Sequence, residues 1–321
     1  MSATEKMPFN WPFRSLLFVP GHKLEWIRKA PKYGPEGLII DLEDAVPPAE
    51  KIGARTTTKV GITFLKSVGL GAFVRINPLD CGGIEDVLNI ATPGLTCVCL
   101  PKLRDAGQIR ELADLLSYAE GCAGLERGSV AIMALPETAE GLCDVREIAS
   151  ASPRVKSVMT GVIDRISDDV VFTGDTALAA GFIPTREGLE QLYLTSKLCL
   201  ESRAGGAPYP MATLVGTNIN DAGAARILIR RMKSTGFTGC IAIHPSHVTI
   251  ANEIFRPSPN EVKFQVGVLK AMCEAEAAGH FAVRYKGMMI DQANVAIARR
   301  IIEEARRCGM TIPAGEDCGA D

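Results

Sequence analysis

The sequence predicts an α/β protein whose main body is a closed parallel (β/α)8 barrel, the TIM-barrel architecture, with a C-terminal helical extension. Short apolar or β-branched runs recur about eight times along the chain, and amphipathic segments lie between them. The runs are almost continuously apolar, which is typical of strands covered by helices on both faces of a parallel sheet. Eight such repeats favour a closed barrel. An open doubly wound sheet is the alternative, because it shows the same alternation.

Each expected strand coincides with one apolar run, and each expected helix with one amphipathic segment. The expected strands are 15–19, 37–41, 72–76, 96–100, 129–135, 157–160, 211–215 and 240–243. The expected helices include 109–119, 144–151 and 222–234 and, after the last strand, about 260–278 and 291–308.

The chain is expected to divide into a barrel, an arm and a tail. Residues 1–250 would form the catalytic barrel, and residues 251–310 a helical arm that begins near the chain breakers Pro257 and Pro259. An arm of this size buries little apolar surface by itself. It should therefore pack on the barrel or on an adjacent subunit, which predicts an oligomer. Residues 311–321, rich in glycine and acids, would be a flexible tail.

The composition excludes several classes of protein. The chain has 321 residues and is 47% hydrophobic, which is ample for a large core. A formal net charge of −2 without a clustered basic face argues against a nucleic-acid partner. No apolar run approaches the roughly 18 residues of a membrane span, and residues 1–10 lack the apolar core of a signal peptide, so we expect a cytoplasmic protein without a membrane partner. The ten cysteines have no C-x-x-C spacing and should be reduced thiols.

In a (β/α)8 barrel the active site lies at the carboxyl ends of the strands, where this chain carries polar residues. These residues include the acids Glu137 and Asp164, which follow neighbouring expected strands. Carboxylates placed this way can share a hard divalent cation such as Mg²⁺. Arg75 lies at the end of another strand, where its alternative role is a salt bridge with Asp41 or Glu43. The pattern predicts a metal-dependent enzyme that acts on an oxygen-rich substrate.

Seven segments carry short motifs in order along the chain. They are RSLLFVPG (14–21), DLEDAV (41–46) with Lys51 and Arg55, VRIN (74–77), PK (101–102), ETAEG (137–141), GFTG (236–239) with IHP (243–245), and YKGMMID (285–291). Together these motifs resemble those of the citrate lyase beta-subunit-like enzymes and the malyl-CoA lyases, within the HpcH/HpaI aldolase-type superfamily.

The resemblance implies a Mg²⁺-dependent lyase, with Mn²⁺ as a possible substitute. Such enzymes reversibly cleave a carbon–carbon bond of a β-hydroxyacyl-CoA thioester of malyl, citramalyl or citryl type into an acyl-CoA and a 2-oxo acid. Glu137 and Asp164 match the family's metal ligands. Arg75 would bind the carbonyl or enolate oxygen on which negative charge develops.

The resemblance also implies a catalytic role for the arm. Asp291 would come from an adjacent subunit and remove a proton from the acyl group in the condensation direction. This arm exchange implies a homotrimer or homohexamer. As a bare sequence feature, however, Asp291 is an ordinary helix N-cap.

Two further acids, Glu43 and Asp44, would serve catalysis from behind the metal. They would hold water at the metal or orient Arg75, whereas a salt bridge with Lys51 or Arg55 is their alternative role.

Five residues match positions that bind the CoA thioester in the malyl-CoA lyases. Cationic side chains near the first strand would meet the phosphates, and the others would contact the thioester or nucleotide portion. These substrate-binding candidates are Phe18, Lys23, Lys29, Ile243 and His244.

The chain departs from the family beside the second metal acid. Relatives usually carry Leu or Phe after this Asp, whereas this chain carries Arg165. Arg165 would pair with Asp168 and Asp169 or bind an extra substrate carboxylate. Two other functions therefore stay open. One is a metal-dependent aldolase that cleaves a free hydroxy-oxo acid without CoA, and the other is a non-catalytic citrate lyase beta-like subunit.

Overall fold

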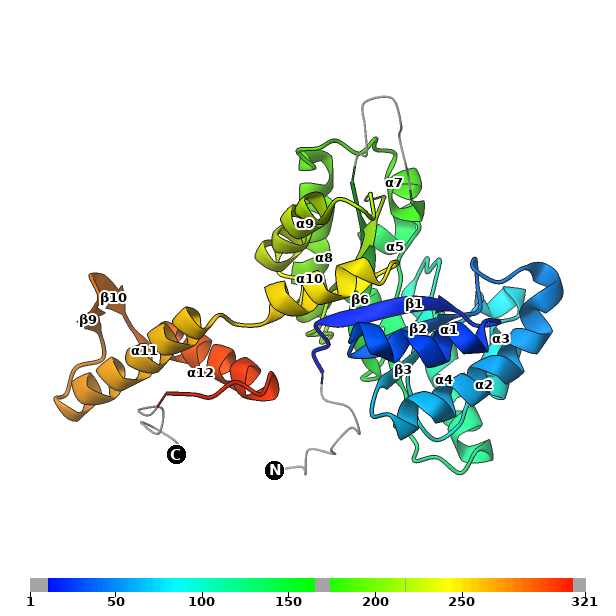
Figure 1. The fold of residues 1–321 in the computed structure, drawn as a ribbon, viewed down its shortest axis with the longest axis horizontal. Helices are drawn as coiled ribbons and strands as arrows, with labels where there is room; N and C mark the ends of the chain where they lie inside the picture. Colours follow the sequence, from blue (N-terminus) through cyan, green and yellow to red (C-terminus); the bar gives the residue numbers. More distant parts are fainter. Residues whose placement is uncertain (1–10, 165–173, 217, 314–321) are drawn as a thin grey trace. The chain divides into compact units, whose positions relative to one another are not determined.

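A computed structural model describes residues 11–164, 174–216 and 218–313 of the chain. Its main body is a closed barrel of parallel strands in chain order, and β8 pairs with β1 to close it (Figure 1). The predicted (β/α)8 fold is confirmed. The strands are β1 (Ser15–Pro20), β2 (Gly37–Asp41), β3 (Gly71–Arg75), β4 (Leu95–Leu100), β5 (Ala131–Ala134), β6 (Val155–Ile163), β7 (Met211–Val215) and β8 (Gly239–Ala242).

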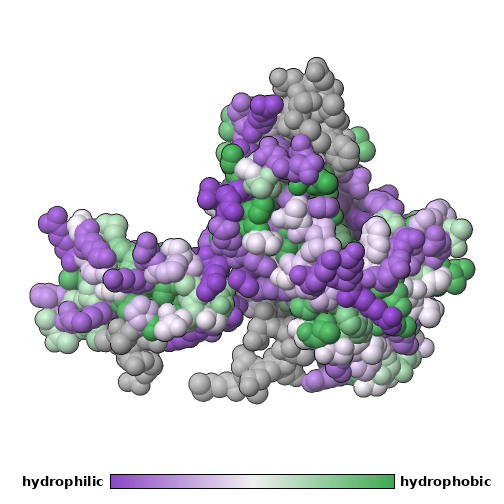
Figure 2. Space-filling view, in the orientation of Figure 1, coloured by the Kyte–Doolittle hydropathy of each residue, from purple (hydrophilic) through white to green (hydrophobic). Residues whose placement is uncertain are grey.

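Helices cover the outside of the barrel, and on the face shown in Figure 2 hydrophilic side chains cover much of their outer surface. No helix in the described ranges is long and apolar enough to cross a membrane. The α-helices are α1 (Leu24–Lys29), α2 (Lys51–Ser67), α3 (Gly83–Ile90), α4 (Ala106–Cys122), α5 (Ala139–Cys143), α6 (Val145–Ser150), α7 (Asp175–Ala180), α8 (Leu192–Ala204), α9 (Ala222–Thr235) and α10 (Ser246–Phe255). The 3-10 helices are η1 (Ala30–Tyr33), η2 (Pro48–Glu50), η3 (Leu79–Cys81) and η4 (Leu189–Gln191).

Strand β6 is longer than the expected 157–160, because it has to meet two staggered neighbours. Its first residues pair with β5, whereas Met159 to Ile163 pair with β7. Stagger of this kind is required when a sheet closes into a barrel. It places Asp164, at the end of β6, beside the end of β7, where the Asp164 N–H donates to the carbonyl oxygen of Val215 at 2.9 Å.

Aromatic side chains fill the amino-terminal end of the barrel. The ring of Trp11 packs edge-on against Phe13 and Phe73, with centroid distances of 5.2 and 5.6 Å. Glycine at the start of β3 fits this packing, because a Cβ on Gly71 would lie only 3.0 Å from the Phe13 ring. Since side chains pack this end of the barrel, a substrate would have to enter at the carboxyl ends of the strands.

A buried ion pair joins α4 to the start of β6. Glu120 is fully buried, and its two carboxylate oxygens accept from Nη1 and Nη2 of Arg154 at 2.8 and 2.7 Å. The N–H groups of Gly128 and Val130 also donate to the carboxylate, at 2.8 and 2.9 Å. Burial by itself would raise the pKa of Glu120, but these donors hold it below its ordinary value. The carboxylate therefore stays ionised inside the protein.

The described residues from 254 to 313 form a second compact unit, in which α11 (Pro259–Ala277) packs on α12 (Gln292–Arg307). Their shared core includes Val266, Leu269 and Ile302. A short antiparallel hairpin, β9 (Val283–Tyr285) and β10 (Met288–Ile290), connects the two helices. The sequence analysis expected the helices but not this hairpin. Most of the expected tail, 311–321, lies outside the described residues.

Candidate active site

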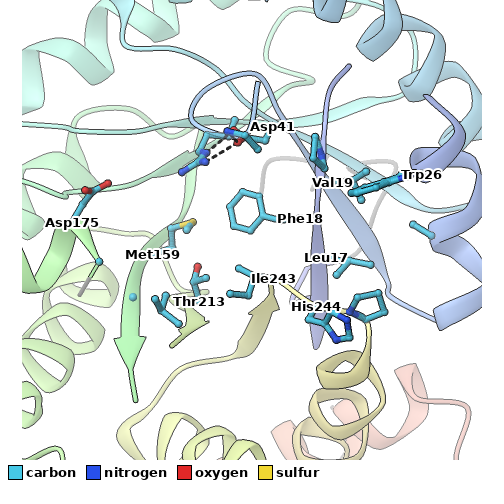
Figure 3. Close-up of a pocket in the computed structure, with 18 of the residues that line it drawn as sticks. Leu17, Phe18, Val19, Trp26, Asp41, Met159, Asp175, Thr213, Ile243 and His244 are labelled. Carbon is cyan, nitrogen blue, oxygen red and sulfur yellow. Dashed lines mark hydrogen bonds and ion pairs between the residues drawn. The ribbon is translucent and has the colours of Figure 1, made fainter. Parts of the chain in front are cut away.

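A cavity of about 640 Å³ opens at the carboxyl ends of the barrel strands. Residues from β1, β2, β3, β6 and β7 and from the loops after β5 and β8 line it (Figure 3). Side chains from segments far apart in the sequence meet here because the strands converge at this end of the barrel. This is the place where active sites occur in (β/α)8 barrels.

The guanidinium of Arg75 is held by two carboxylates. Its Nε and Nη2 donate to the two oxygens of Asp41 at 2.7 and 2.8 Å (Figure 3), and Nη1 lies 3.1 Å from Glu43 Oε2. The Phe18 ring lies under the guanidinium, 5.0 Å from ring centroid to Cζ. Burial would raise the pKa of Asp41, but the hydrogen bonds and charge of Arg75 hold it below its ordinary value. The geometry of Arg75 is thus fixed before any ligand binds.

Glu43 and Asp44 contact Arg75 and Lys102, not the alternative partners expected for them. Glu43 Oε1 lies 2.8 Å from Lys102 Nζ, and Asp44 Oδ1 lies 3.6 Å from the same nitrogen. Lys51 donates instead to the carbonyl oxygens of Leu42 and Glu43. Burial raises the pKa of Glu43, although Arg75 and Lys102 oppose this rise.

Arg55, the other cation considered for these acids, pairs with Asp86 at 2.7 Å. Both alternative partners are therefore engaged elsewhere. The contact that orients Arg75, one of the roles expected for Glu43, is present.

Glu137 differs from Asp41, the acid that holds Arg75, because no cation pairs with Glu137 among the described residues. One of its oxygens accepts from the backbone N–H of Lys102 at 3.3 Å. Burial raises the pKa of Glu137 to about 7; the charge of Arg75 opposes this rise, and Glu43 and Asp175 add to it. A carboxylate kept half-buried without a counter-charge is a natural ligand for a cation.

Asp164, the other expected metal ligand, directly follows β6 and is half-buried. It is not among the residues that line the cavity. Within 11–164, 174–216 and 218–313, no group of three His, Cys, Asp or Glu side chains is arranged to hold a metal. A pair of acids on neighbouring strands nevertheless fits Mg²⁺, which usually binds one or two carboxylates and keeps several water or substrate ligands.

The expected thioester-binding residues are distributed unevenly. Phe18, Lys29, Ile243 and His244 all line the cavity. Lys23 does not line it and instead occupies the N-cap position of α1. His244 is half-buried, and its Nδ1 lies 2.8 Å from the hydroxyl of Ser246.

Asp291 belongs to the C-terminal unit, where it caps α12. Its carboxylate accepts from the backbone N–H groups of Ala293 and Asn294 at 3.0 and 3.4 Å. The side chain of Asn294 accepts in return from the Asp291 N–H, which completes a capping box. Arg165, Asp168 and Asp169 lie outside the described residues.

Two charged residues near Glu137 had no role in the sequence analysis. Lys102 links Glu43 to Glu137, and its backbone has a positive φ of 54°, which a residue other than glycine adopts only when its surroundings enforce it. Its position at a strand end and its place in the PK motif were the available sequence signals. Asp175 begins α7 and lines the cavity on the side away from Trp26 (Figure 3). It comes from a helix and not from a strand end, so the barrel rule could not find it.

A barrel that gathers its charged residues around one cavity at the carboxyl ends of its strands belongs to the enzymes of the (β/α)8 class. Comparison with known proteins makes this more specific. The chain belongs to the HpcH/HpaI aldolase/citrate lyase family, whose model matches residues 14–245. Homologues of this family identify it as a carbon–carbon lyase.

Three relatives illustrate the range of the family. A citrate lyase subunit beta-like protein from Deinococcus radiodurans is 33% identical over 90% of this chain and 96% of its own length. An L-malyl-CoA/beta-methylmalyl-CoA lyase from Cereibacter sphaeroides is 30% identical over 92% of this chain and 95% of its own. In structure, the chain resembles CitE from Mycobacterium tuberculosis in complex with magnesium, acetoacetate and coenzyme A, with a TM-score of 0.68 and 24% identity over 91% of this chain and 97% of CitE.

Proposed function

We propose that this lyase cleaves a β-hydroxyacyl-CoA thioester of malyl, citramalyl or citryl type into an acyl-CoA and a 2-oxo acid, or forms it in the reverse direction, and that it requires Mg²⁺. One observation carries this proposal. A pre-oriented Arg75 and an unpaired Glu137 line the same cavity. The first offers donors for an oxygen that becomes negative, and the second offers a ligand for a divalent cation.

Glu137 and Asp164 would hold the Mg²⁺ ion. Their acid type and their positions after neighbouring strands β5 and β6 fit this ion, and the pKa of Glu137 near 7 shows how unfavourable an uncompensated carboxylate is at this site. When bound, Mg²⁺ supplies Lewis-acid stabilisation for the carboxylate and carbonyl oxygens of the 2-oxo acid.

Protein side chains would stabilise the charge that develops when the carbon–carbon bond breaks. During cleavage the substrate hydroxyl gives its proton to solvent, and its oxygen becomes the carbonyl oxygen of the 2-oxo acid. The bond between the hydroxyl-bearing carbon and the α-carbon of the thioester breaks, and its two electrons form the thioester enolate. Arg75 meets the enolate oxygen, and Asp41 and Glu43 hold the guanidinium in place so that little reorganisation is needed. Protonation of the enolate carbon then gives the acyl-CoA.

Asp291 is the acid that we assign to this last proton transfer, and in the reverse direction it is the base. The residue would come from the arm of a second copy of the chain in a homotrimer or homohexamer. Lys29, Phe18, Ile243 and His244 would contact the CoA portion, since they line the same cavity as Arg75. Lys23, on the cap of α1, would meet a phosphate from outside the cavity.

The proposed reaction is tested by incubating the full chain and Mg²⁺ with malyl-, β-methylmalyl-, citramalyl- and citryl-CoA and measuring release of the 2-oxo acid. A panel of free hydroxy-oxo acids is run in parallel. Cleavage of a thioester supports the proposal. Cleavage of the free acids alone would assign the protein to the CoA-independent aldolases.

The role of Asp291 is separated from its capping role by Asp291→Asn. Asparagine caps helices as well as aspartate does, so the fold should be unchanged, whereas an amide cannot carry the proton and kcat should fall at least about a hundred-fold. Mixing this variant with Arg75→Ala should restore part of the activity through mixed subunits. Confirmed subunit exchange without any rescue would contradict a shared site.

A further inference from the structure

Lys102 contacts both halves of the candidate site, the expected metal ligand Glu137 and the acid that holds Arg75. The backbone N–H of Lys102 donates to Glu137 Oε2 at 3.3 Å, and its Nζ lies 2.8 Å from Glu43 Oε1. The other oxygen of Glu43 lies 3.1 Å from Arg75 Nη1. Arg75 and Glu137 line the cavity, whereas Lys102 and Glu43 are not among the lining residues that the structure describes. Lys102 therefore meets the site from outside the cavity.

Three contacts fix the backbone turn that carries Lys102. The N–H of Leu103 donates to the carbonyl oxygen of Leu135 at 3.1 Å, and the hydroxyl of Thr138 donates to the carbonyl oxygen of Leu103 at 2.7 Å. Gly141 packs directly against this same carbonyl oxygen, so that an added Cβ would collide with it. The PK motif and the ETAEG motif, which are far apart in the sequence, thus form one packed unit.

This unit holds Lys102 at a positive φ of 54°. A lysine adopts such a backbone only when its surroundings enforce it, because its Cβ then crowds a neighbouring carbonyl oxygen. In this conformation the N–H is directed to Glu137 and the side chain reaches Glu43. Backbone strain that is retained beside functional residues is consistent with a positioning role.

The ammonium of Lys102 holds one oxygen of Glu43. Glu43 is 3% exposed, and within the described ranges the contacts of its two carboxylate oxygens are ion pairs and not regular hydrogen bonds. Arg75 contacts one oxygen and Lys102 the other. Without Lys102, Oε1 would be buried without this cation. The carboxylate would then rotate more freely, and the contact that orients Arg75 would loosen.

We propose that Lys102 is a positioning residue that holds Glu137 and Arg75 in register. Its backbone N–H acts on the metal ligand, and its ammonium acts on Arg75 through Glu43. The inference rests on the proposed function, which assigns the enolate oxygen to Arg75. The two actions are separable, because substitution of the side chain removes the ammonium and retains the N–H. Side-chain variants should therefore slow the chemical step and leave metal binding intact.

Lys102→Met provides the first test, with the full chain, Mg²⁺ and the thioester that it cleaves. We expect kcat to fall about ten-fold or more, as is usual when a residue that orients a metal-dependent site is lost, and KM to change less than about three-fold. The Kd of Mg²⁺, obtained from the rise in Tm of the metal-free protein, should not increase by more than about three-fold. Lys59→Met on the exposed surface of α2 is the matched control and should leave all three values unchanged.

Two more variants at the same position separate positioning from a merely structural role. Lys102→Arg keeps a cation near Glu43 and should retain more of kcat than Lys102→Met. Lys102→Gly relieves the positive φ and keeps the N–H, so it should fold even if Lys102→Met does not. It should lose kcat to the same extent as Lys102→Met. A normal kcat in Lys102→Gly would show that the ammonium has no role and would overturn the inference.

A double-mutant cycle with Glu43→Gln tests the route from Lys102 to Arg75. If the ammonium acts through Glu43, adding Lys102→Met to Glu43→Gln should lower kcat less than about two-fold further, because the contact is already lost. A further loss of about ten-fold would show that Lys102 acts independently of Glu43 and would overturn the inference. So would a weakened affinity for Mg²⁺ in Lys102→Met with an unchanged kcat.

Failure of the proposed function would give a different result. If the chain cleaves only free hydroxy-oxo acids, the thioester proposal is wrong, but the same comparisons of kcat with those acids still test Lys102, since their cleavage also develops an enolate. Turnover of neither class of substrate would overturn the proposed function and this inference together.

Discussion

The unpaired carboxylate of Glu137 should destabilise the folded barrel at neutral and alkaline pH. Its pKa rises from an ordinary value of 4.5 to about 7, chiefly through burial. One pH unit of displacement corresponds to about 1.4 kcal/mol, so the full effect is about 3 kcal/mol above pH 7. Glutamine at this position also loses some hydration, so we expect Glu137→Gln to stabilise the metal-free protein by about 2 kcal/mol at pH 8.

Proton binding determines how the stability gain of Glu137→Gln depends on pH. The folded carboxyl holds its proton more tightly than the unfolded one, so below pH 4.5 both states are protonated and Glu137 costs nothing. The cost grows between pH 4.5 and about 7 and is complete above that range. The stability gain of Glu137→Gln should therefore be small at pH 5 and large at pH 8.

Tryptophan fluorescence during thermal unfolding provides the assay. Both tryptophans, Trp11 and Trp26, belong to the barrel unit, so the signal excludes the C-terminal unit. A gain of about 2 kcal/mol should raise Tm by about 4–8 °C. Glu111→Gln on the exposed surface of α4 is the matched control and should show no pH-dependent gain. Mg²⁺ at pH 8 should raise Tm of the original protein but not of Glu137→Gln. A gain of the same size at pH 5 and pH 8 would refute this account of Glu137.

Three further predictions concern charged groups of the barrel. Arg75→Lys should lower kcat at least about a hundred-fold with unchanged circular dichroism, because lysine cannot form two parallel hydrogen bonds with Asp41. Arg110→Lys on the surface is the control. Near-normal turnover of Arg75→Lys would contradict the role of Arg75 at the enolate oxygen. Lys102→Gly should relieve the strain of the positive φ but remove the cation that opposes the rise in the pKa of Glu43. The acid limb of the pH–kcat profile should therefore move to higher pH. An unmoved limb would count against the contact between Lys102 and Glu43. Arg154→Met should lower the free energy of unfolding by about 3–5 kcal/mol, because it leaves the Glu120 carboxylate buried without its cation. Adding Glu120→Leu should restore much of this stability, which thermal unfolding measures. A double variant no more stable than Arg154→Met would exclude this explanation.

The pattern of apolar residues along the sequence was sufficient to predict the barrel, because each strand coincides with its own apolar run. Buried parallel strands must be apolar on both faces, and this requirement acts residue by residue. The bounds of β6 could not be predicted in the same way. Its length depends on the stagger between β5 and β7, which is a property of the closed barrel and not of the segment 155–163.

In the C-terminal unit, too, some features could be predicted from the sequence and others could not. The capping boxes at Ser258 and Asp291 mark the starts of its helices in the sequence. The hairpin between the helices escaped prediction because its strands have only three residues each. Runs this short carry no readable periodicity.

The sequence by itself determined the barrel, the polar rim at its carboxyl ends, and the acids and arginine that resemble those of a lyase family. Only the tertiary structure decided which charges meet: Arg75 with Asp41, Lys102 with Glu43, and Glu137 with no cation among the described residues. The physical reason is that electrostatic interactions and desolvation depend on distances through space. Barrel closure sets those distances by bringing together strand ends that are far apart in the chain.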